Sequence, residues 1–257
     1  MPEQPLIFHI PHAALLVPPA ERLSLVISEA ELEIERLKMT DWYTDEIFSA
    51  AAVAGDEIVA FPVSRLVLDP ERFVDDEHEP MASRGMGVVY TRRHDRTVLR
   101  DNLDEKDRLV ETYFVPHHRR LEDAVERHLV AHGRAIIIDC HSFPSSPLPY
   151  ERVQDPIRPE ICIGTDATHT PEWLRDGLLG AFDEAGYAVD VNTPFDGSLV
   201  PMRYYGKEPL VQSVMIELRR DIYMDETSAL RNDGYLRAMS AVQKAIAAVR
   251  RLAPPGL

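Results

Sequence analysis

Short apolar runs alternate along this chain with longer segments in which apolar residues recur at helical spacing. The clearest strand is residues 135–139, where aliphatic residues run without interruption up to Asp139; such a run is typical of a central strand covered on both faces. Further strands are predicted over residues 6–10, 57–61, 66–68, 86–90, 161–164, 187–191 and 213–217. Helices are predicted over 104–132, 171–186 and 233–252, and two more within 28–54, separated near residues 39–41.

This alternation of strands and helices predicts an α/β fold, a three-layer α/β/α sandwich around a mostly parallel mixed sheet. Neither an internal repeat nor a linker interrupts the pattern, so we expect residues 1–257 to form one domain. Two segments lack periodicity. Residues 69–85 are charged and residues 144–159 are rich in proline and serine, and both are predicted to be loops, the second over a site.

Charge and composition narrow the classes of partner. The chain has 28 basic and 43 acidic side chains, a net charge of −15, so a nucleic-acid partner is not expected. An anionic small-molecule substrate stays possible, because a cluster of arginines reverses the potential locally. No apolar run approaches the roughly 18 residues that cross a bilayer, and residues 1–5 carry no basic or apolar signal region. We therefore expect a soluble, cytoplasmic protein.

The two cysteines, Cys140 and Cys162, do not suggest a disulfide framework, because small secreted domains use more cysteines in a shorter chain. They are predicted to be reduced, buried thiols.

Polar side chains end three of the predicted strands. His9 and His12 end the first, Asp139 and His141 the central one, and Glu217 the last. In open α/β sheets ligands gather at the carboxyl ends of strands. Two histidines and a carboxylate that converge there would match a catalytic zinc, which takes about three protein ligands and keeps one position open. The alternative is a set of buried histidines held by neighbouring carboxylates.

The remaining histidines lack this strand-end context. His169 precedes a predicted helix start, where a capping role suffices. The others lie in charged surroundings and are predicted to face solvent; they are His78, His94, His117, His118, His128 and His132.

Several motifs, in order from about residue 6 to residue 226, resemble those of the N-formylglutamate amidohydrolase family. They are Pro11-His12-Ala13 followed by Val17-Pro18, residues 41–48, Ser64-Arg65, Asp69-Pro70-Glu71-Arg72, residues 85–90, residues 139–142, residues 192–195 and residues 217–225. The resemblance implies a zinc hydrolase on the phosphorylase/hydrolase-like fold shared with zinc carboxypeptidases.

The resemblance also implies roles for particular residues. His12 and His141 would bind one Zn²⁺ ion, with a carboxylate from residues 41–46 as the third ligand. Asp45 is favoured and Asp41 is the next candidate, although acids there also stabilise a helix N-terminus without any metal. Glu217 would be the general base. The arginines that would hold substrate carboxylates, each with a salt bridge as the alternative role, are Arg65, Arg72 and Arg220.

The implied reaction is hydrolysis of N-formyl-L-glutamate to formate and glutamate, a step of histidine catabolism. Two departures from the family pattern stand out. Ala13-Ala14 replaces Ser-Gly, and Glu71 replaces the asparagine usually found before Arg72, which adds a negative charge where an anionic substrate would bind. The alternatives are a related hydrolase of another N-acyl amino acid or a peptidoglycan-like amide, and a non-catalytic binding protein on the same scaffold. The ligand set also suits iron, cobalt or manganese.

Overall fold

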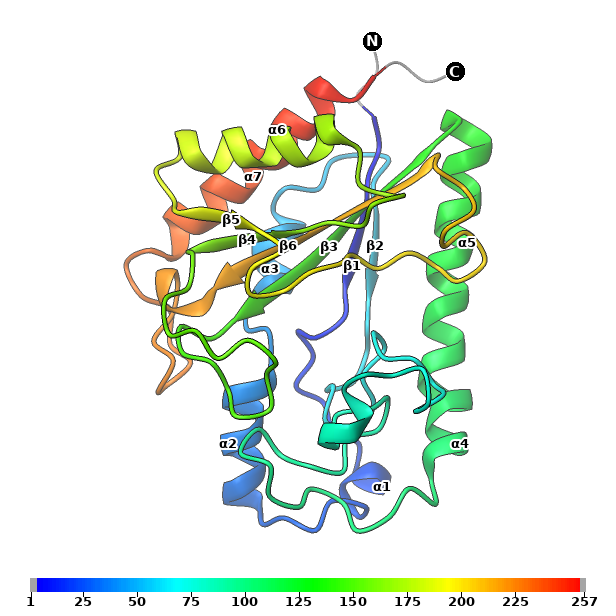
Figure 1. Cartoon of the computed structure of the whole chain (residues 1–257), viewed down its shortest axis with the longest axis vertical. Helices are drawn as coiled ribbons and strands as arrows, with labels where there is room; N and C mark the ends of the chain where they lie inside the picture. The colour runs from blue at the N-terminus through cyan, green and yellow to red at the C-terminus, as the bar shows by residue number, and fades with distance from the viewer. Residues whose placement is uncertain (1–3, 255–257) are drawn as a thin grey trace.

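A six-stranded mixed sheet, of order β2-β1-β3-β6-β4-β5, forms the centre of the molecule in the computed structural model, which describes residues 4–254 (Figure 1). The strands are β1 (Ile7–Ile10), β2 (Glu57–Ala60), β3 (Ala135–Phe143), β4 (Ile161–Gly164), β5 (Val189–Val191) and β6 (Val211–Arg219). Strands β2, β1, β3 and β6 are parallel, whereas β4 runs antiparallel to β6 and carries β5 parallel to itself. The predicted mostly parallel sheet is thus confirmed.

Helices cover both faces of the sheet, which confirms the three-layer architecture (Figure 1). Helices α3, α6 and α7 lie on one face and α5 on the other. The helices are α1 (Pro19–Arg22), α2 (Glu29–Met39), α3 (Thr44–Ser49), α4 (Lys106–Leu109), α5 (Val115–His132), α6 (Glu172–Glu184) and α7 (Tyr235–Leu252). The predicted helix over 104–132 is divided by a π-helical turn, Val110–Phe114, just before Pro116, which has no N–H for a regular helical bond.

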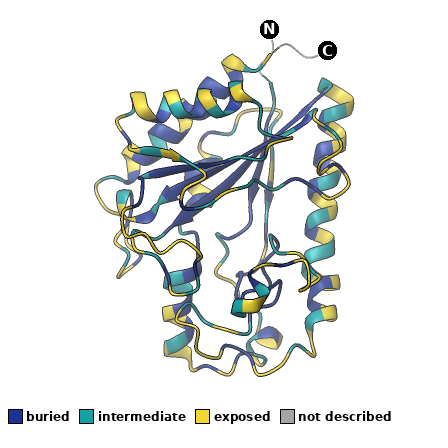
Figure 2. Ribbon diagram, in the orientation of Figure 1, coloured by how far each residue is buried: buried dark blue, intermediate teal, exposed yellow. Residues whose placement is uncertain are grey.

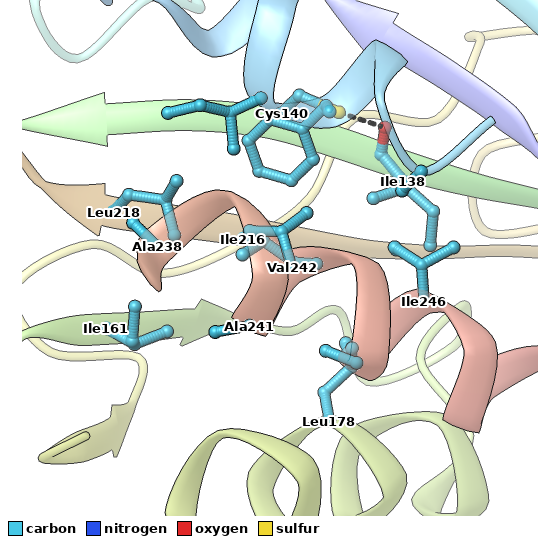
Figure 3. Packing of buried hydrophobic residues seen from close by; sticks show 14 of the residues in the cluster. Ile138, Cys140, Ile161, Leu178, Ile216, Leu218, Ala238, Ala241, Val242 and Ile246 are labelled. Atoms are coloured by element: carbon cyan, nitrogen blue, oxygen red, sulfur yellow. Dashed lines mark hydrogen bonds between the residues drawn. The ribbon is translucent and has the colours of Figure 1, made fainter. Parts of the chain in front are cut away.

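The larger core lies between the sheet and helices α6 and α7. Alternate residues of β3, among them Ile138 and Cys140, point to this face and pack near Val242 and Ile246 of α7 (Figure 3). The Cys140 thiol lies 3.2 Å from the carbonyl oxygen of Ile138. Cys140 and Cys162 are both buried free thiols, as predicted.

The opposite face of the sheet changes character along β3. Near the amino end, Ala135 and Ile137 pack in one apolar cluster with Leu121 and Val125 of α5. Further along the same face the alternation brings out Asp139, a buried polar residue, and then His141. Strand β3 therefore contributes apolar core residues near its amino end and polar site residues near its carboxyl end.

The predictions of strands over 66–68 and 86–90 are wrong. Both segments are buried loops, although Leu66, Val67 and Tyr90 are as inaccessible as strand residues. Their backbone carbonyls accept hydrogen bonds from the buried Arg100 guanidinium, at 2.6 Å for Leu66, 3.2 Å for Val67 and 2.8 Å for Tyr90. A side chain thus satisfies carbonyls that a neighbouring strand would otherwise pair.

The other predicted elements are confirmed to within a few residues, and residues 144–159 contain neither helix nor strand after β3 ends at Phe143. Burial follows the layers, with most exposed residues on outer helix faces and in loops (Figure 2). Within residues 4–254 no helix is both long and apolar enough to cross a bilayer. Residues 1–3, part of the segment predicted to lack a secretory signal, lie outside the described residues.

Candidate active site

The pairing of three parallel strands places a group of polar side chains at their carboxyl ends. In the β1–β3 register His9 lies opposite Asp139, and in the β3–β6 register His141 lies opposite Glu217. Residues opposite each other on parallel neighbours share a face, and Asp139 and His141 are two positions apart on β3. The strands therefore present all four side chains on the α5 face.

His12, which follows β1 after Pro11, joins this group from the loop. The centroids of its ring and the His141 ring are 5.1 Å apart, so the predicted meeting of the two imidazoles is observed. Asp41 lies beside both: its Oδ2 is 3.5 Å from Nδ1 of His12 and 3.2 Å from Nδ1 of His141. The backbone supports this arrangement, because the Asp41 N–H donates to the His12 carbonyl at 3.1 Å.

Carboxylates also contact the outer nitrogens of the two rings. Nε2 of His12 lies 2.8 Å from Oδ1 of Asp69. Nε2 of His141 lies 3.2 Å from Oδ1 of Asp139 and 3.2 Å from Oε1 of Glu71. Carboxylate partners of this kind set the orientation and tautomer of a metal-binding imidazole.

The charges of the cluster stabilise one another. Burial alone would lower the pKa of His141, but Glu71, Asp139 and Asp41 raise it well above its usual value. Burial alone would raise the pKa of Asp41, but a hydrogen bond from His141 and the nearby charges of His12 and Arg220 hold it well below its usual value. The carboxylates therefore stay ionised within the protein interior.

Glu217 is an exception among these acids. Its carboxyl group is buried, and Oε2 has no hydrogen-bond partner among the described residues. Burial raises the pKa of Glu217 to about 8; the nearby Asp41 and Glu71 act in the same direction, against His141. A carboxyl group with this pKa exchanges a proton near neutral pH, as a general base or acid requires.

Asp45, the favoured third ligand, is not brought to the histidines. Helix α3 begins at Thr44 and presents Asp45 on its exposed face, whereas Asp41 lies before the helix and is buried. The reason is geometric: Asp41 and Asp45 do not share one helix, so the four-residue spacing does not put them on one face. Asp41 occupies the position expected of Asp45.

Two of the three predicted substrate-binding arginines are engaged inside the protein. Nη2 of Arg65 lies 2.8 Å from Asp69, and Nη2 of Arg220 lies 3.1 Å from Asp41. Arg72 is less committed, because its closest carboxylate contact is 3.7 Å, to Asp69, and its Nε has no hydrogen-bond partner among the described residues.

Sequence reasoning left out several groups that the structure places here. The chain folds Glu71 back from the 69–85 loop onto His141, and Tyr90 donates a hydrogen bond to Asp69. Asp139 had a usable signal, since it stands two positions from His141 and so on the same face of a strand. The family pattern placed Glu71 beside a substrate-binding arginine, but only the loop's path brings it against His141.

The prediction that the helical histidines face solvent is wrong for His117 and His128, which are buried. Nε2 of His117 lies 2.9 Å from Nε2 of His9, because α5 packs across the end of β1. Nε2 of His118 lies 2.7 Å from the Pro70 carbonyl. His169 is buried and does not cap the helix; its Nδ1 lies 2.7 Å from the Val211 carbonyl.

The side chains present fit a divalent metal ion. Nδ1 of His12 is buried without a hydrogen-bond partner among the described residues, beside a buried carboxylate. Two sets of residues each bring one ligand atom per residue within 4.8 Å of one another: His12, Glu71 and His141, and His9, Glu71 and Asp139. Nitrogen and oxygen donors in such sets suit zinc and other first-row divalent metals.

Fold and site together define an α/β protein with a histidine–carboxylate centre at the carboxyl edge of its sheet. A family model described as N-formylglutamate amidohydrolase matches residues 4–224. The chain therefore belongs to the N-formylglutamate amidohydrolase family.

Named relatives agree with this assignment. The chain is 28% identical over 231 residues to an N-formylglutamate deformylase of Pseudomonas putida, covering 87% of this chain and 83% of that protein. A protein of the same name from Pseudomonas aeruginosa is 28% identical over 230 residues, with 86% and 83% covered. The crystal structure of N-formylglutamate amidohydrolase from Ralstonia eutropha JMP134 has the same fold, with a TM-score of 0.81 at 24% identity over 95% of this chain and 92% of that one.

Proposed function

We propose that this protein hydrolyses the formyl amide of N-formyl-L-glutamate in a zinc-dependent reaction that yields formate and L-glutamate. One observation carries the proposal: His12, His141 and Asp41 meet at one point with the buried Glu217 carboxyl on the adjacent strand. The relatives named as N-formylglutamate deformylases support the choice of substrate. The products would place the enzyme in histidine catabolism, in the cytoplasm.

Three side chains would hold the metal ion. His12 and His141 would bind through Nδ1 and Asp41 through Oδ2, because this oxygen lies 3.5 Å and 3.2 Å from the two Nδ1 atoms. Asp69 and Asp139 would then accept hydrogen bonds from the outer Nε2 atoms. Zinc bound there would polarise the amide carbonyl and lower the pKa of water towards neutrality.

Glu217 would move the proton. Its raised pKa fits a group that accepts a proton from the attacking water and delivers it to the leaving amine nitrogen, so that amide cleavage releases a neutral amine. Burial keeps bulk water from competing for that proton. Arg220 lowers the pKa of Glu217 but does not cancel the effect of burial, and its guanidinium is engaged with Asp41 and with the Ser142 backbone and hydroxyl.

The arginines would divide into two roles. Arg72 would hold a carboxylate of the substrate, since its guanidinium is the least committed of the three. Arg65 and Arg220 would instead position Asp69 and Asp41 through their ion pairs. This division replaces the expectation that all three contact the substrate.

Metal analysis of the purified protein, joined to a formate-release assay on N-formyl-L-glutamate, tests the proposal. Zinc should copurify, a chelator should abolish formate release, and added zinc should restore it. Glu217→Gln should lower kcat about 10²- to 10⁴-fold while metal content stays unchanged. Glu184→Gln, on the exposed end of α6, is the matched control and should retain full activity. Unchanged turnover in Glu217→Gln would remove Glu217 from the mechanism.

The position of Glu71 favours a second candidate, the same reaction on another N-acyl amino acid. Its carboxylate stands 3.2 Å from Nε2 of His141, where its charge would repel a nearby substrate carboxylate. A panel of N-formyl, N-acetyl and N-succinyl amino acids separates the two. A higher kcat/KM for an uncharged side chain than for glutamate would select the second candidate.

A further inference from the structure

The Glu71 carboxylate faces two groups of ligand atoms at once. Its Oε2 is 3.8 Å from Nε2 of His12. Its Oε1 is 3.2 Å from Nε2 of His141 and 3.5 Å from Nδ1 of His9. Nδ1 of His9 is itself 2.8 Å from Oδ1 of Asp139, so the second group combines two carboxylates and an imidazole within 4.8 Å.

The carboxylates of Glu71 and Asp139 form no ion pair with arginine or lysine among the described residues. Asp41 and Asp69 each have an arginine partner, Arg220 and Arg65 respectively. In the part of the chain that the structure describes, every ion pair of Glu71 and Asp139 is instead with a histidine. Two buried or nearly buried carboxylates without a permanent cation are costly unless a proton or a metal ion lies between them.

We propose that His9, Asp139 and Glu71 form a second divalent-cation site, next to the ion that His12, His141 and Asp41 would hold. The inference deepens the proposed function and rests on it, because the second ion would lie beside the proposed catalytic ion. Glu71 suits this role because its Oε1 lies 3.5 Å from Nδ1 of His9 and 3.2 Å from Nε2 of His141.

The surroundings of His9 support its role as a ligand. Nε2 of His9 meets Nε2 of His117 at 2.9 Å, so an N–H on His9 that donates to His117 leaves Nδ1 free to bind an ion. Helix α5 holds His117 in place, and Leu199 N–H donates to the second oxygen of Asp139 at 3.0 Å. A metal-binding histidine and carboxylate with such outer partners form a preorganised site.

Metal stoichiometry tests the second site directly. The purified chain is stripped with chelator, dialysed against Zn²⁺ at increasing free concentrations, and analysed by plasma mass spectrometry. Wild type should saturate at two ions per chain and Glu71→Gln at one. Glu77→Gln, an exposed acid on the same loop, is the control and should bind two. Saturation of the wild type at one ion, or two ions retained by Glu71→Gln, would overturn the proposal.

Loading the protein with Mn²⁺ allows a measurement of the second site that does not depend on protein stability. Electron paramagnetic resonance should show spin coupling between two ions in the wild type and an uncoupled signal in Glu71→Gln. His9→Asn, whose folding is checked by circular dichroism, should give the same uncoupled signal. A coupled spectrum in both variants would contradict the second site.

Formate release measured on the same preparations separates this proposal from the proposed function. One ion per chain with full formate release would refute the second site and support the proposed deformylase function. Two coupled ions without formate release from N-formyl-L-glutamate would support the second site and refute the proposed function.

Discussion

Asp41 and Asp45 show how a single position decides whether an acid reaches the site. Both are acidic, they are four residues apart, and the spacing by itself suggests that they share a helix face. In the structure Asp41 is buried against two imidazoles, while Asp45 is exposed on α3. Desolvation makes the buried acid the better ligand candidate, because a metal ion compensates its charge and exposed acids are already hydrated.

Asp41→Asn should therefore weaken zinc binding strongly, and Asp45→Asn should not. We expect at least about a 100-fold rise in the zinc Kd for Asp41→Asn, since an anionic ligand is replaced by a neutral one; loss of a group that only orients a ligand costs about 10- to 100-fold. Competition with a chromophoric chelator measures both values. A larger loss of affinity in Asp45→Asn than in Asp41→Asn would restore Asp45 as the ligand.

At the scale of elements, strand β3 and the helices that cover it both stabilise the fold and position the polar side chains of the site. Alternation along β3 sends Ile138 and Cys140 into the α7 core and Asp139 and His141 into the site. Loosening the core beneath β3 thus affects the whole sheet. The apolar runs of the sequence predicted β3 and α7 correctly, but read the buried loop at 66–68 as a strand. Apolar runs indicate burial, and only pairing makes a strand.

Truncation of α7 at its buried face should destabilise the protein without altering the site's residues. Ile246→Ala should lower the free energy of unfolding by about 2–5 kcal/mol, because Ile246 is buried and its loss leaves a cavity. Leu236→Ala on the same helix, at a side chain 73% exposed, should change it by less than about 0.5 kcal/mol. Urea denaturation measures both variants. Equal effects would show that α7 does not pack as described.

At the scale of the whole molecule, the buried charges of the site link folding to pH. Glu217 has a folded-state pKa of about 8, above the 4.5 usual for an unfolded chain. Below pH 4.5 the carboxyl is protonated in both states. As pH rises from 4.5 to 8, the unfolded state ionises first, so the folded state loses stability across this window.

In metal-free protein, Glu217→Gln should remove this loss. Each unit of pKa difference corresponds to about 1.4 kcal/mol, so the variant should gain on the order of a few kcal/mol over wild type between pH 5 and pH 8. Urea unfolding with chelator present at the two pH values measures it. Identical pH dependence in wild type and variant would contradict the raised pKa.

Zinc should stabilise the folded molecule, because its ligands come from segments that meet only after folding. At a zinc concentration about 100 times Kd, the free energy of unfolding should rise by about 2.7 kcal/mol. Thermal unfolding followed with and without zinc measures the shift, with His12→Ala as the control that should show a smaller one. An equal shift in that variant would place the stabilising metal elsewhere.

The sequence by itself determined the alternation of strands and helices, the sheet's central strand and the strand ends at which His12, His141 and Glu217 stand. These follow from local periodicity, which the chain carries without reference to its fold. Only the tertiary structure decided that Asp41 and not Asp45 meets the histidines, that Glu71 turns into the site, and that His117 is buried against His9. Those contacts join residues up to 108 positions apart in the case of His9 and His117, and depend on loop paths and strand register that no local pattern encodes.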